Sequence, residues 1–119
     1  MIPTHLFTNP AEFESYQAGQ VIFAEGDPAG KMYVVSEGEV EIYVHGHLVE
    51  TLGAGGVFGE MALIEQRARS AKVVAKTHCK VVPIDEKRFA FLVQNTPFFS
   101  LTIMKIMADR LRRTDALID

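Results

Sequence analysis

Short runs of β-branched and aromatic residues alternate with glycine turns through the first half of the chain. All nine glycines lie between Gly19 and Gly59, and they recur about every eight residues, as in strands joined by turns. Within one such run Val40, Ile42 and Val44 alternate with polar residues, which predicts a strand with one face in the core. Four strands are predicted in this half, at Gln20–Ala24, Met32–Ser36, Glu39–Val44 and Leu48–Leu52.

The second half begins with strand character and then changes to a helical period. Ser70–Lys76 and Lys80–Ile84 are predicted strands, and Asp85 is positioned to cap a helix that runs through Gln94. The chain is therefore predicted to form an antiparallel β-roll or barrel followed by helices. A barrel roughly eight strands wide can hold one small ligand.

A last helix is predicted after Thr96 and Pro97, a cap followed by a proline at the first helical position, and it extends to Leu117. An apolar face wider than one stripe exceeds what a single contact needs. We expect the helix to pack on the barrel, with dimerisation as the alternative use of the second stripe. Its apolar residues are Phe98, Leu101, Met104, Ile106, Met107, Ala108, Leu111, Leu117 and Ile118.

Length and composition favour one soluble domain. The chain has 119 residues, of which 48% are apolar and 23% charged. Its longest near-apolar stretch, Pro97–Met104, is far short of the ~20 residues of a membrane span. Glu12 and Glu14 argue against a secretory signal, so we expect a cytoplasmic location. The single cysteine, Cys79, excludes an internal disulfide and is interpreted as a small half-buried strand residue.

The formal net charge of −3 conceals two parts of opposite sign. Through Gln66 the chain has ten acidic residues and one basic residue, Lys31, which gives −9. From Arg67 onward it has eleven basic and five acidic residues, which gives +6. A site for an anion is therefore expected after residue 66.

The candidate site lies where the charge changes sign, in residues 57–71. Gly59 precedes a short helical segment, whose first backbone N–H groups lack partners within the helix and suit an anion. Arg69 adds a planar guanidinium that pairs with phosphate, and Ser70 and Ala71 add a hydroxyl and an N–H donor. A carboxylate beside a phosphate site, Glu60, is explained by a ligand with hydroxyl groups next to its phosphate, as in ribose.

At these positions the chain resembles the cyclic nucleotide-binding domains of the catabolite activator protein, protein kinase A regulatory subunits and cyclic nucleotide-gated channels. The resemblance spans Tyr16–Leu117 and implies a mainly β fold with C-terminal helices. That fold is an antiparallel β-roll or double-stranded jelly-roll barrel with a short phosphate-binding helix and two C-terminal helices. The residues that carry the resemblance most strongly are Phe58, Gly59, Glu60, Met61, Ala62 and Leu63, followed by Arg69, Ser70 and Ala71.

The resemblance implies a ligand-binding role for these residues. Glu60 would accept a hydrogen bond from the ribose 2′-hydroxyl, Arg69 would neutralise the cyclic phosphate, and the Ser70 hydroxyl would lie near the phosphate or the base. Further donors to the phosphate would be the backbone N–H groups of Gly59, Met61, Ala62 and Ala71.

The last helix is implied to act as a lid. In the family, Leu63 and a hinge aromatic, here Phe89, repack when ligand enters, and the helix closes over the base. Arg110 and Thr114 match the residues by which the lid of the catabolite activator protein reaches its ligand. These two matches favour cAMP, whereas Ser70 equally suits a guanine and keeps cGMP as the alternative.

The expected organisation is one domain, residues 1–119. It has an N-terminal segment at 1–18, a β-roll at 19–84 with a phosphate-binding cassette at 58–71, and hinge and lid helices at 85–118. We expect a stand-alone, non-enzymatic receptor without cofactor or metal. Its partners would be a cyclic mononucleotide, an unidentified protein effector and a second copy bound through the last helix. A membrane is not expected as a partner, because no apolar stretch is long enough to span one. Nucleic acid is not expected as a direct partner, because no helix-turn-helix domain follows.

Three features depart from the family pattern. The helix that precedes the barrel is expected only at Leu6–Tyr16, which is short for a coupling role. Lys72 stands where many members have threonine or an apolar residue, and the strand alternation predicts an outward side chain. Asp115 occupies the position at which the partner subunit of the catabolite activator protein offers a serine to the base, which argues against a shared dimer pocket.

Alternative interpretations of the same residues stay open. Glu60 and Arg69 could form a structural ion pair in an interaction or dimerisation module of the same fold that binds no nucleotide. His45 and His47, with Glu50, superficially suggest a metal-dependent cupin enzyme, although the two histidines flank a predicted hairpin turn. The basic cluster at residues 110–113 suggests a nucleic-acid contact. The alternative is that these side chains are simply solvated, or interact with the helix dipole, at the end of a helix.

Overall fold

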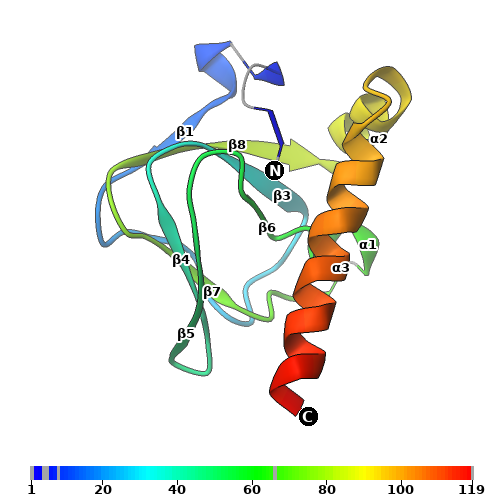
Figure 1. Ribbon diagram of the computed structural model, residues 1–119. Helices are drawn as coiled ribbons and strands as arrows, with labels where there is room; N and C mark the ends of the chain where they lie inside the picture. The colour runs from blue at the N-terminus through cyan, green and yellow to red at the C-terminus, as the bar shows by residue number, and fades with distance from the viewer. Residues whose placement is uncertain (1, 4–5, 8, 66, 119) are drawn as a thin grey trace.

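Two four-stranded antiparallel sheets form a roll, and two longer helices lie along one side of it (Figure 1). The structure, a computed structural model, describes residues 2–3, 6–7, 9–65 and 67–118, and for residues 113–118 it describes the helical backbone alone. The strands are β1 (Glu14–Tyr16), β2 (Val21–Phe23), β3 (Lys31–Glu37), β4 (Val40–Val44), β5 (His47–Leu52), β6 (Val57–Phe58), β7 (Lys72–Ala75) and β8 (Cys79–Asp85). The helices are α1 (Met61–Ile64), α2 (Glu86–Asn95) and α3 (Phe99–Ile118).

The order of the strands shows how the chain closes into a roll. One sheet has the order β1-β8-β3-β6 and the other has the order β2-β7-β4-β5. Most strands therefore pair with a strand distant in sequence, as in a jelly roll and unlike a simple meander. The predicted fold class, a β-roll with C-terminal helices, is confirmed.

The sheet that contains β3 and β8 is buried on both faces. On its outer face Met32 and Ile84 join a core with Phe99 of α3. On its inner face Val35 and Val81 join a second core inside the roll. This sheet therefore packs against the helices on one side and closes the interior of the roll on the other.

Strand β6 belongs to both cores although it has two residues. Val57 packs in the helix-side core and Phe58 in the inner core, each 1% exposed. Neighbouring residues in a strand point to opposite faces, which explains this division. The segment that follows, the predicted cassette, is thereby anchored against both cores where it begins.

The two C-terminal helices lie close to the predicted positions. Asp85 accepts a hydrogen bond from the Arg88 backbone N–H at 2.8 Å, which confirms it as the N-cap of α2. Helix α3 begins at Phe99, slightly later than predicted, because Thr96 has extended backbone angles and ends α2, and a turn follows it.

The segment before the roll differs from the prediction. The helix expected at Leu6–Tyr16 is wrong, because Pro10–Glu12 form a single 3₁₀ turn and Glu14–Tyr16 form β1. Strand β1 pairs with β8, from Glu14 opposite Val81 to Tyr16 opposite Cys79. The unpaired edge of β8 offers a ladder of backbone hydrogen bonds, which outweighs a weak local preference for helix.

The six predicted strands are confirmed, with ends shifted by at most two residues. Strands β1 and β6 were not predicted. Lys72 is exposed on β7 between Ala71 and the buried Val73, as its alternation predicts. Within the described residues, no helix combines the length and the apolar character that crossing a membrane requires.

Candidate functional site

A cavity of about 880 Å³ lies inside the roll and is bordered by α3. Its polar wall contains Glu60 and Arg69, which are 7% and 9% exposed, together with Arg110 from α3. The cavity therefore joins an apolar wall to a wall with buried charges of both signs. The apolar wall comes from the sheet of β2, β7, β4 and β5, through Phe23, Ile42, Val44, Val49 and Val73.

Arg69 is held by backbone carbonyls and an aromatic ring. Its Nη2 donates to the Lys31 carbonyl at 2.8 Å and its Nη1 to the Gly59 carbonyl at 3.3 Å. Its Cζ lies 4.0 Å from the centroid of the Phe23 ring, within the range of a cation–π contact. The backbone N–H of Arg69 also donates to the Asp27 carbonyl at 2.9 Å, which ties the residue to the turn before β3.

The surroundings of Arg69 leave one of its donors unused. Its Nε is the one buried side-chain nitrogen or oxygen without a hydrogen-bond partner in the part of the chain that the structure describes. Burial lowers the pKa of this guanidinium, and nearby Tyr33, Asp27 and Glu60 partly oppose that shift. Among the described residues no carboxylate forms an ion pair with it. The cavity wall therefore contains a buried positive charge without a direct counter-ion.

Gly59 makes room for this arginine. Its φ of +75° lies in the left-handed region, and an added Cβ would stand 2.7 Å from Arg69 Nη1 and 3.3 Å from the Lys31 carbonyl oxygen. Glycine is required both by the backbone conformation and by the close approach of the guanidinium. The glycine that precedes Glu60 in the motif is thereby explained.

Arg110 extends from α3 to three acceptors on the roll. Its Nη1 donates to Glu60 Oε1 at 2.5 Å, its Nε to Glu50 Oε1 at 3.2 Å, and its Nη2 to the Val57 carbonyl. We call this group of contacts the Arg110 bridge. Burial alone would lower the pKa of Arg110, but the carboxylates of Glu60 and Glu50 outweigh burial and raise the pKa above its ordinary value. The bridge joins the last helix to the cavity wall.

Helix α1 separates the predicted cassette residues into two groups. Met61 and Ala62 line the cavity, and the Ala62 N–H donates to the Gly59 carbonyl at 3.2 Å. Leu63 is absent from the described cavity wall and packs against the helix-side core, as Phe89 does. Successive residues of one helical turn point in different directions, so Leu63 packs on the helix side of α1 while Met61 and Ala62 line the cavity, and its contact with ligand stays a prediction.

The structure brings most of the other predicted site residues to one cavity. Phe89 packs against the helix-side core with its ring 5.6 Å from that of Phe99 in an edge-on arrangement, and its hinge role stays a prediction. Thr114 lies on α3, but its side chain, like that of Asp115, lies outside the described residues. The predicted residues in the cavity wall are Phe58, Gly59, Glu60, Met61, Ala62, Arg69, Ser70, Ala71 and Arg110.

Sequence reasoning missed the part that Glu50 has in the site. The register of β4 and β5 shifts from Ile42 opposite Glu50 to Tyr43 opposite Leu48, so that β5 carries one extra residue, Val49. The usable signal was strand alternation, because Leu52 packs against the inner core and a residue two positions away shares its face. That alternation places Glu50 on the inner face.

The histidines expected to lie at a hairpin turn do so. His45 and Gly46 have φ of 50° and 81°, as in a tight turn between β4 and β5, and the His45 backbone N–H donates to Glu25 Oε1 at 2.7 Å. In the described ranges, no group of three or more histidine, cysteine, aspartate or glutamate side chains could hold a metal ion. Glu50 is engaged with Arg110, so the metal-site interpretation of His45, His47 and Glu50 receives no support.

Comparisons with known proteins agree on the family of the chain. A family model described as a cyclic nucleotide-binding domain matches residues 13–96. The cAMP-dependent protein kinase regulatory subunit of Schizosaccharomyces pombe is 40% identical over 81 residues, which cover 67% of this chain and 20% of that protein. The chain thus spans about a fifth of the length of this relative.

Solved structures resemble the fold along most of the chain. The catabolite activator protein of Thermus thermophilus matches with a TM-score of 0.80 at 26% identity, covering 98% of this chain and 61% of that one. An EAL enzyme with cAMP bound matches with a TM-score of 0.63 at 30% identity, covering 87% of this chain and 29% of that one. The cGMP-bound form of the same enzyme matches with a TM-score of 0.64, also at 30% identity and with the same coverage.

Proposed function

The chain belongs to the family of cyclic nucleotide-binding domains, and from that premise we propose that its cavity binds a 3′,5′-cyclic mononucleotide, with cAMP preferred. The observation that carries the proposal is Arg69, a buried cation on the cavity wall whose Nε has no hydrogen-bond partner among the described residues. Burying a charge without a counter-ion is costly, and a cyclic phosphate supplies both the negative charge and the acceptors. The Ser70 hydroxyl and the backbone N–H groups of Gly59, Met61 and Ala71 are the proposed further donors.

Glu60 is the proposed acceptor for the ribose 2′-hydroxyl. Its carboxylate is buried on the same wall as Arg69, and a carboxylate tolerates a nearby phosphate when a hydroxyl donor lies between them. The base would then lie against Ile42, Val44 and Val49, because a flat aromatic ring suits the apolar wall. The two walls of the cavity thus correspond to the two ends of a cyclic nucleotide.

The preference for cAMP rests on Arg110 and on the relatives. The lid arginine predicted from the resemblance lines the cavity, and the kinase relative at 40% identity is named for its dependence on cAMP. The EAL enzyme at 30% identity binds cAMP in one structure and cGMP in another. Because Ser70 also lines the cavity and its hydroxyl suits a guanine, cGMP is the proposed competitor.

Helix α3 is the proposed output of binding. The Arg110 bridge connects it to Glu60, and Phe89 packs with Phe99 at its first turn. A ligand shifts a helix only by its differential affinity for two arrangements, and these two contacts are where such a difference would arise. No catalytic step or cofactor is part of the proposal, since binding itself is the activity.

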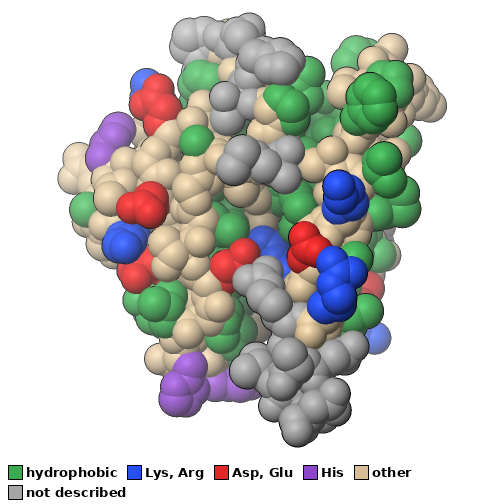
Figure 2. All heavy atoms as spheres, viewed as in Figure 1, with side chains coloured by type: hydrophobic (Ala, Val, Ile, Leu, Met, Phe, Trp, Pro, Cys, Tyr) green, Lys and Arg blue, Asp and Glu red, His purple; other side chains and the backbone are tan. Residues whose placement is uncertain are grey.

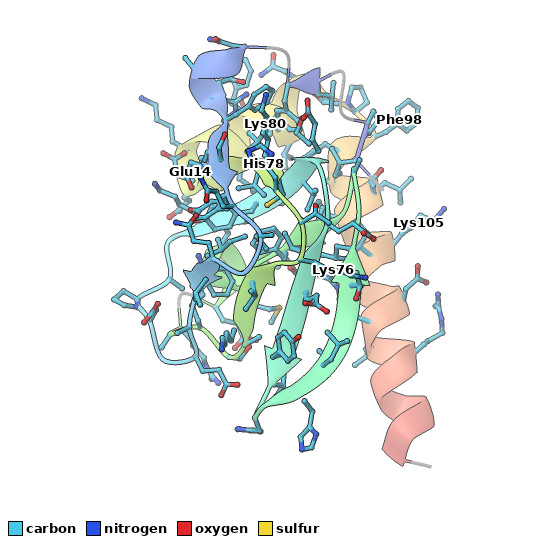
Figure 3. The ribbon with its side chains drawn as sticks, turned by 90° about the vertical axis from the view of Figure 1, so that its left-hand side faces the viewer. Glu14, Lys76, His78, Lys80, Phe98 and Lys105 are labelled. Carbon is cyan, nitrogen blue, oxygen red and sulfur yellow. The ribbon has the colours of Figure 1, made fainter. Side chains whose placement is uncertain are left out.

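A second copy of the chain is the proposed partner of the outer face of α3. Leu101, Met104 and Leu111 are more than half exposed on that helix, and Figure 2 shows hydrophobic side chains along its outer edge. Figure 3 shows Phe98 and Lys105 on the same side of the molecule, away from the β1 strand with Glu14. Sedimentation equilibrium tests the proposal: a dimer weakened by Leu111→Glu supports it, whereas a monomer at every concentration contradicts it and favours an unidentified protein effector on this face.

Calorimetric titration with cAMP and cGMP tests nucleotide binding. Arg69→Ala is expected to cost about 2–4 kcal/mol of binding free energy with the fold retained, because the phosphate loses its counter-charge. Arg112→Ala is the matched control, since Arg112 carries the same charge but lies outside the cavity wall, with a side chain that is 72% exposed and pairs with Asp109. The control is expected to lose no more than about 0.5 kcal/mol.

Two results would count against the proposed function. Unchanged affinity in Arg69→Ala would remove the phosphate contact on which the assignment depends. Failure of the unsubstituted chain to bind either nucleotide at millimolar concentration would favour the alternative, an interaction or dimerisation module of the same fold.

A further inference from the structure

Glu50 is a charged residue of the cavity for which the proposed ligand contacts have no use. Its side chain is 18% exposed on β5, opposite Ile42, in a wall that is otherwise apolar. A carboxylate in such a wall loses solvation. Glu50 and Glu60 also accept from the same guanidinium, which brings two negative charges close together. An arrangement with these costs calls for a function of the side chain.

The strand around Glu50 is irregular. The register shift between β4 and β5 gives β5 one extra residue, Val49, so that Val49 and Glu50, neighbours in sequence, both line the cavity. In a regular strand, two neighbours would point to opposite faces. A bulge that changes the direction of side chains is common beside binding sites.

The contact of Glu50 completes the Arg110 bridge. Arg110 Nε donates to Glu50 Oε1 at 3.2 Å, while Nη1 donates to Glu60 Oε1 at 2.5 Å and Nη2 to the Val57 carbonyl. A guanidinium is planar, so acceptors at Nε and at both Nη atoms together define its plane and its rotation. Glu50 is the acceptor at Nε, the atom through which the side-chain stem enters the plane.

We propose that Glu50 is a positioning residue for the nucleotide: it orients Arg110, which in turn holds Glu60 so that Oε1 is engaged and Oε2 receives the ribose 2′-hydroxyl. The role rests on the proposed function, because it is defined by the ribose contact. It also assigns a reason to the position of Glu50 on the cavity face, since only from that face does the carboxylate meet an arginine 60 residues later in the chain.

A thermodynamic cycle between Glu50 and the 2′-hydroxyl tests this role. The variants are Glu50→Gln, which keeps the size and removes the charge, and Glu41→Gln, a control on the neighbouring strand at a residue outside the cavity wall. The ligands are cAMP and 2′-deoxy-cAMP, titrated by calorimetry into the folded chain, with thermal unfolding as the check on folding. Glu50→Gln is expected to weaken cAMP about tenfold and 2′-deoxy-cAMP much less, because a charge-assisted contact at the ribose is lost.

The outcomes separate this inference from the proposed function. Equal weakening of both nucleotides by Glu50→Gln, or no weakening of either, overturns the positioning role while nucleotide binding stands. A changed ratio of cAMP to cGMP affinity with intact discrimination of the 2′-hydroxyl also overturns it, since Glu50 would then contact the base. Absence of binding by the unsubstituted chain overturns the proposed function and the positioning role with it, whereas an effect of Glu41→Gln equal to that of Glu50→Gln overturns the role alone.

Discussion

Two arginines line the same cavity and are held in opposite ways. Arg69 belongs to the roll, donates to backbone carbonyls and has no ion pair with a carboxylate of the described chain. Arg110 belongs to α3 and pairs with Glu50 and Glu60. Burial lowers the pKa of Arg69, whereas the carboxylates raise that of Arg110. The charge of Arg69 therefore remains available to an anion, whereas the charge of Arg110 is already neutralised by Glu50 and Glu60 and attaches the helix.

Reversing the charge of Arg110 should have the largest effect on this comparison. Arg110→Glu places a third carboxylate beside Glu50 and Glu60, and repulsion is expected to cost about 3 kcal/mol in the local stability of α3. Hydrogen exchange of the backbone around residues 107–112 measures the change. Arg112→Glu is the control, because the Arg112 side chain is 72% exposed and pairs with Asp109, three residues away on the same helix. Similar exchange in the two variants would show that Arg110 does not attach the helix.

A methyl group at Gly59 should disturb the contacts of Arg69 and leave those of Arg110 unchanged. Gly59→Ala is expected to cost about 1–2 kcal/mol of unfolding free energy from the left-handed backbone. It should also reduce cAMP affinity, because the new Cβ would lie 2.7 Å from Arg69 Nη1. Gly19→Ala is the control, since Gly19 has a φ of +86° but nothing within 4 Å of an added Cβ. Denaturant unfolding and calorimetry separate strain from displacement, and equal affinity in both variants would contradict the displacement of Arg69.

Lysine substitutions should give the smallest and most specific difference. Arg69→Lys keeps the charge but loses the planar contacts, and cAMP affinity is expected to fall about tenfold with exchange in α3 unchanged. Arg110→Lys is expected to raise exchange in α3, because one ammonium group cannot reach three separate acceptors in the same geometry. Calorimetry measures cAMP affinity and hydrogen exchange measures the opening of α3. If each variant changed both the affinity and the exchange to the same extent, the two arginines would not have separate roles.

The strands of the roll were predictable where their signal was local. Glycine turns and alternating residues such as Val40 and Ile42 indicate a strand without reference to the rest of the chain. The two strands that were missed depend on distant partners. Glu14–Tyr16 is a strand because β8 presents an edge to it, and Val57–Phe58 is too short to show an alternation of its own.

The polar wall of the site was predictable from local sequence, whereas the contact between Glu50 and Arg110 was not. Gly59, Glu60 and Arg69 lie within eleven residues, so a motif and its chemistry predicted the polar wall. Strand alternation from Leu52 places Glu50 on the inner face, but its contact with Arg110 depends on a helix that crosses the cavity 60 residues later and has no signal near Glu50. The packing of Leu63 against the helix-side core could not be predicted, because a motif states which residues are present and not which way each side chain of a single helical turn points.

The ion pairs between distant residues also bear on the order in which the fold assembles. Glu12 pairs with Arg88, and Glu50 and Glu60 pair with Arg110, over sequence separations of 76, 60 and 50 residues. During synthesis the first 66 residues, with their formal charge of −9, emerge before the basic residues that neutralise them. Contacts that close such long loops form late in folding. Seven of the eleven basic residues that follow residue 66 precede α3 and neutralise part of this charge as β7, β8 and α2 are made. The two contacts of Arg110 with Glu50 and Glu60 are therefore expected to close last, when α3 has been made.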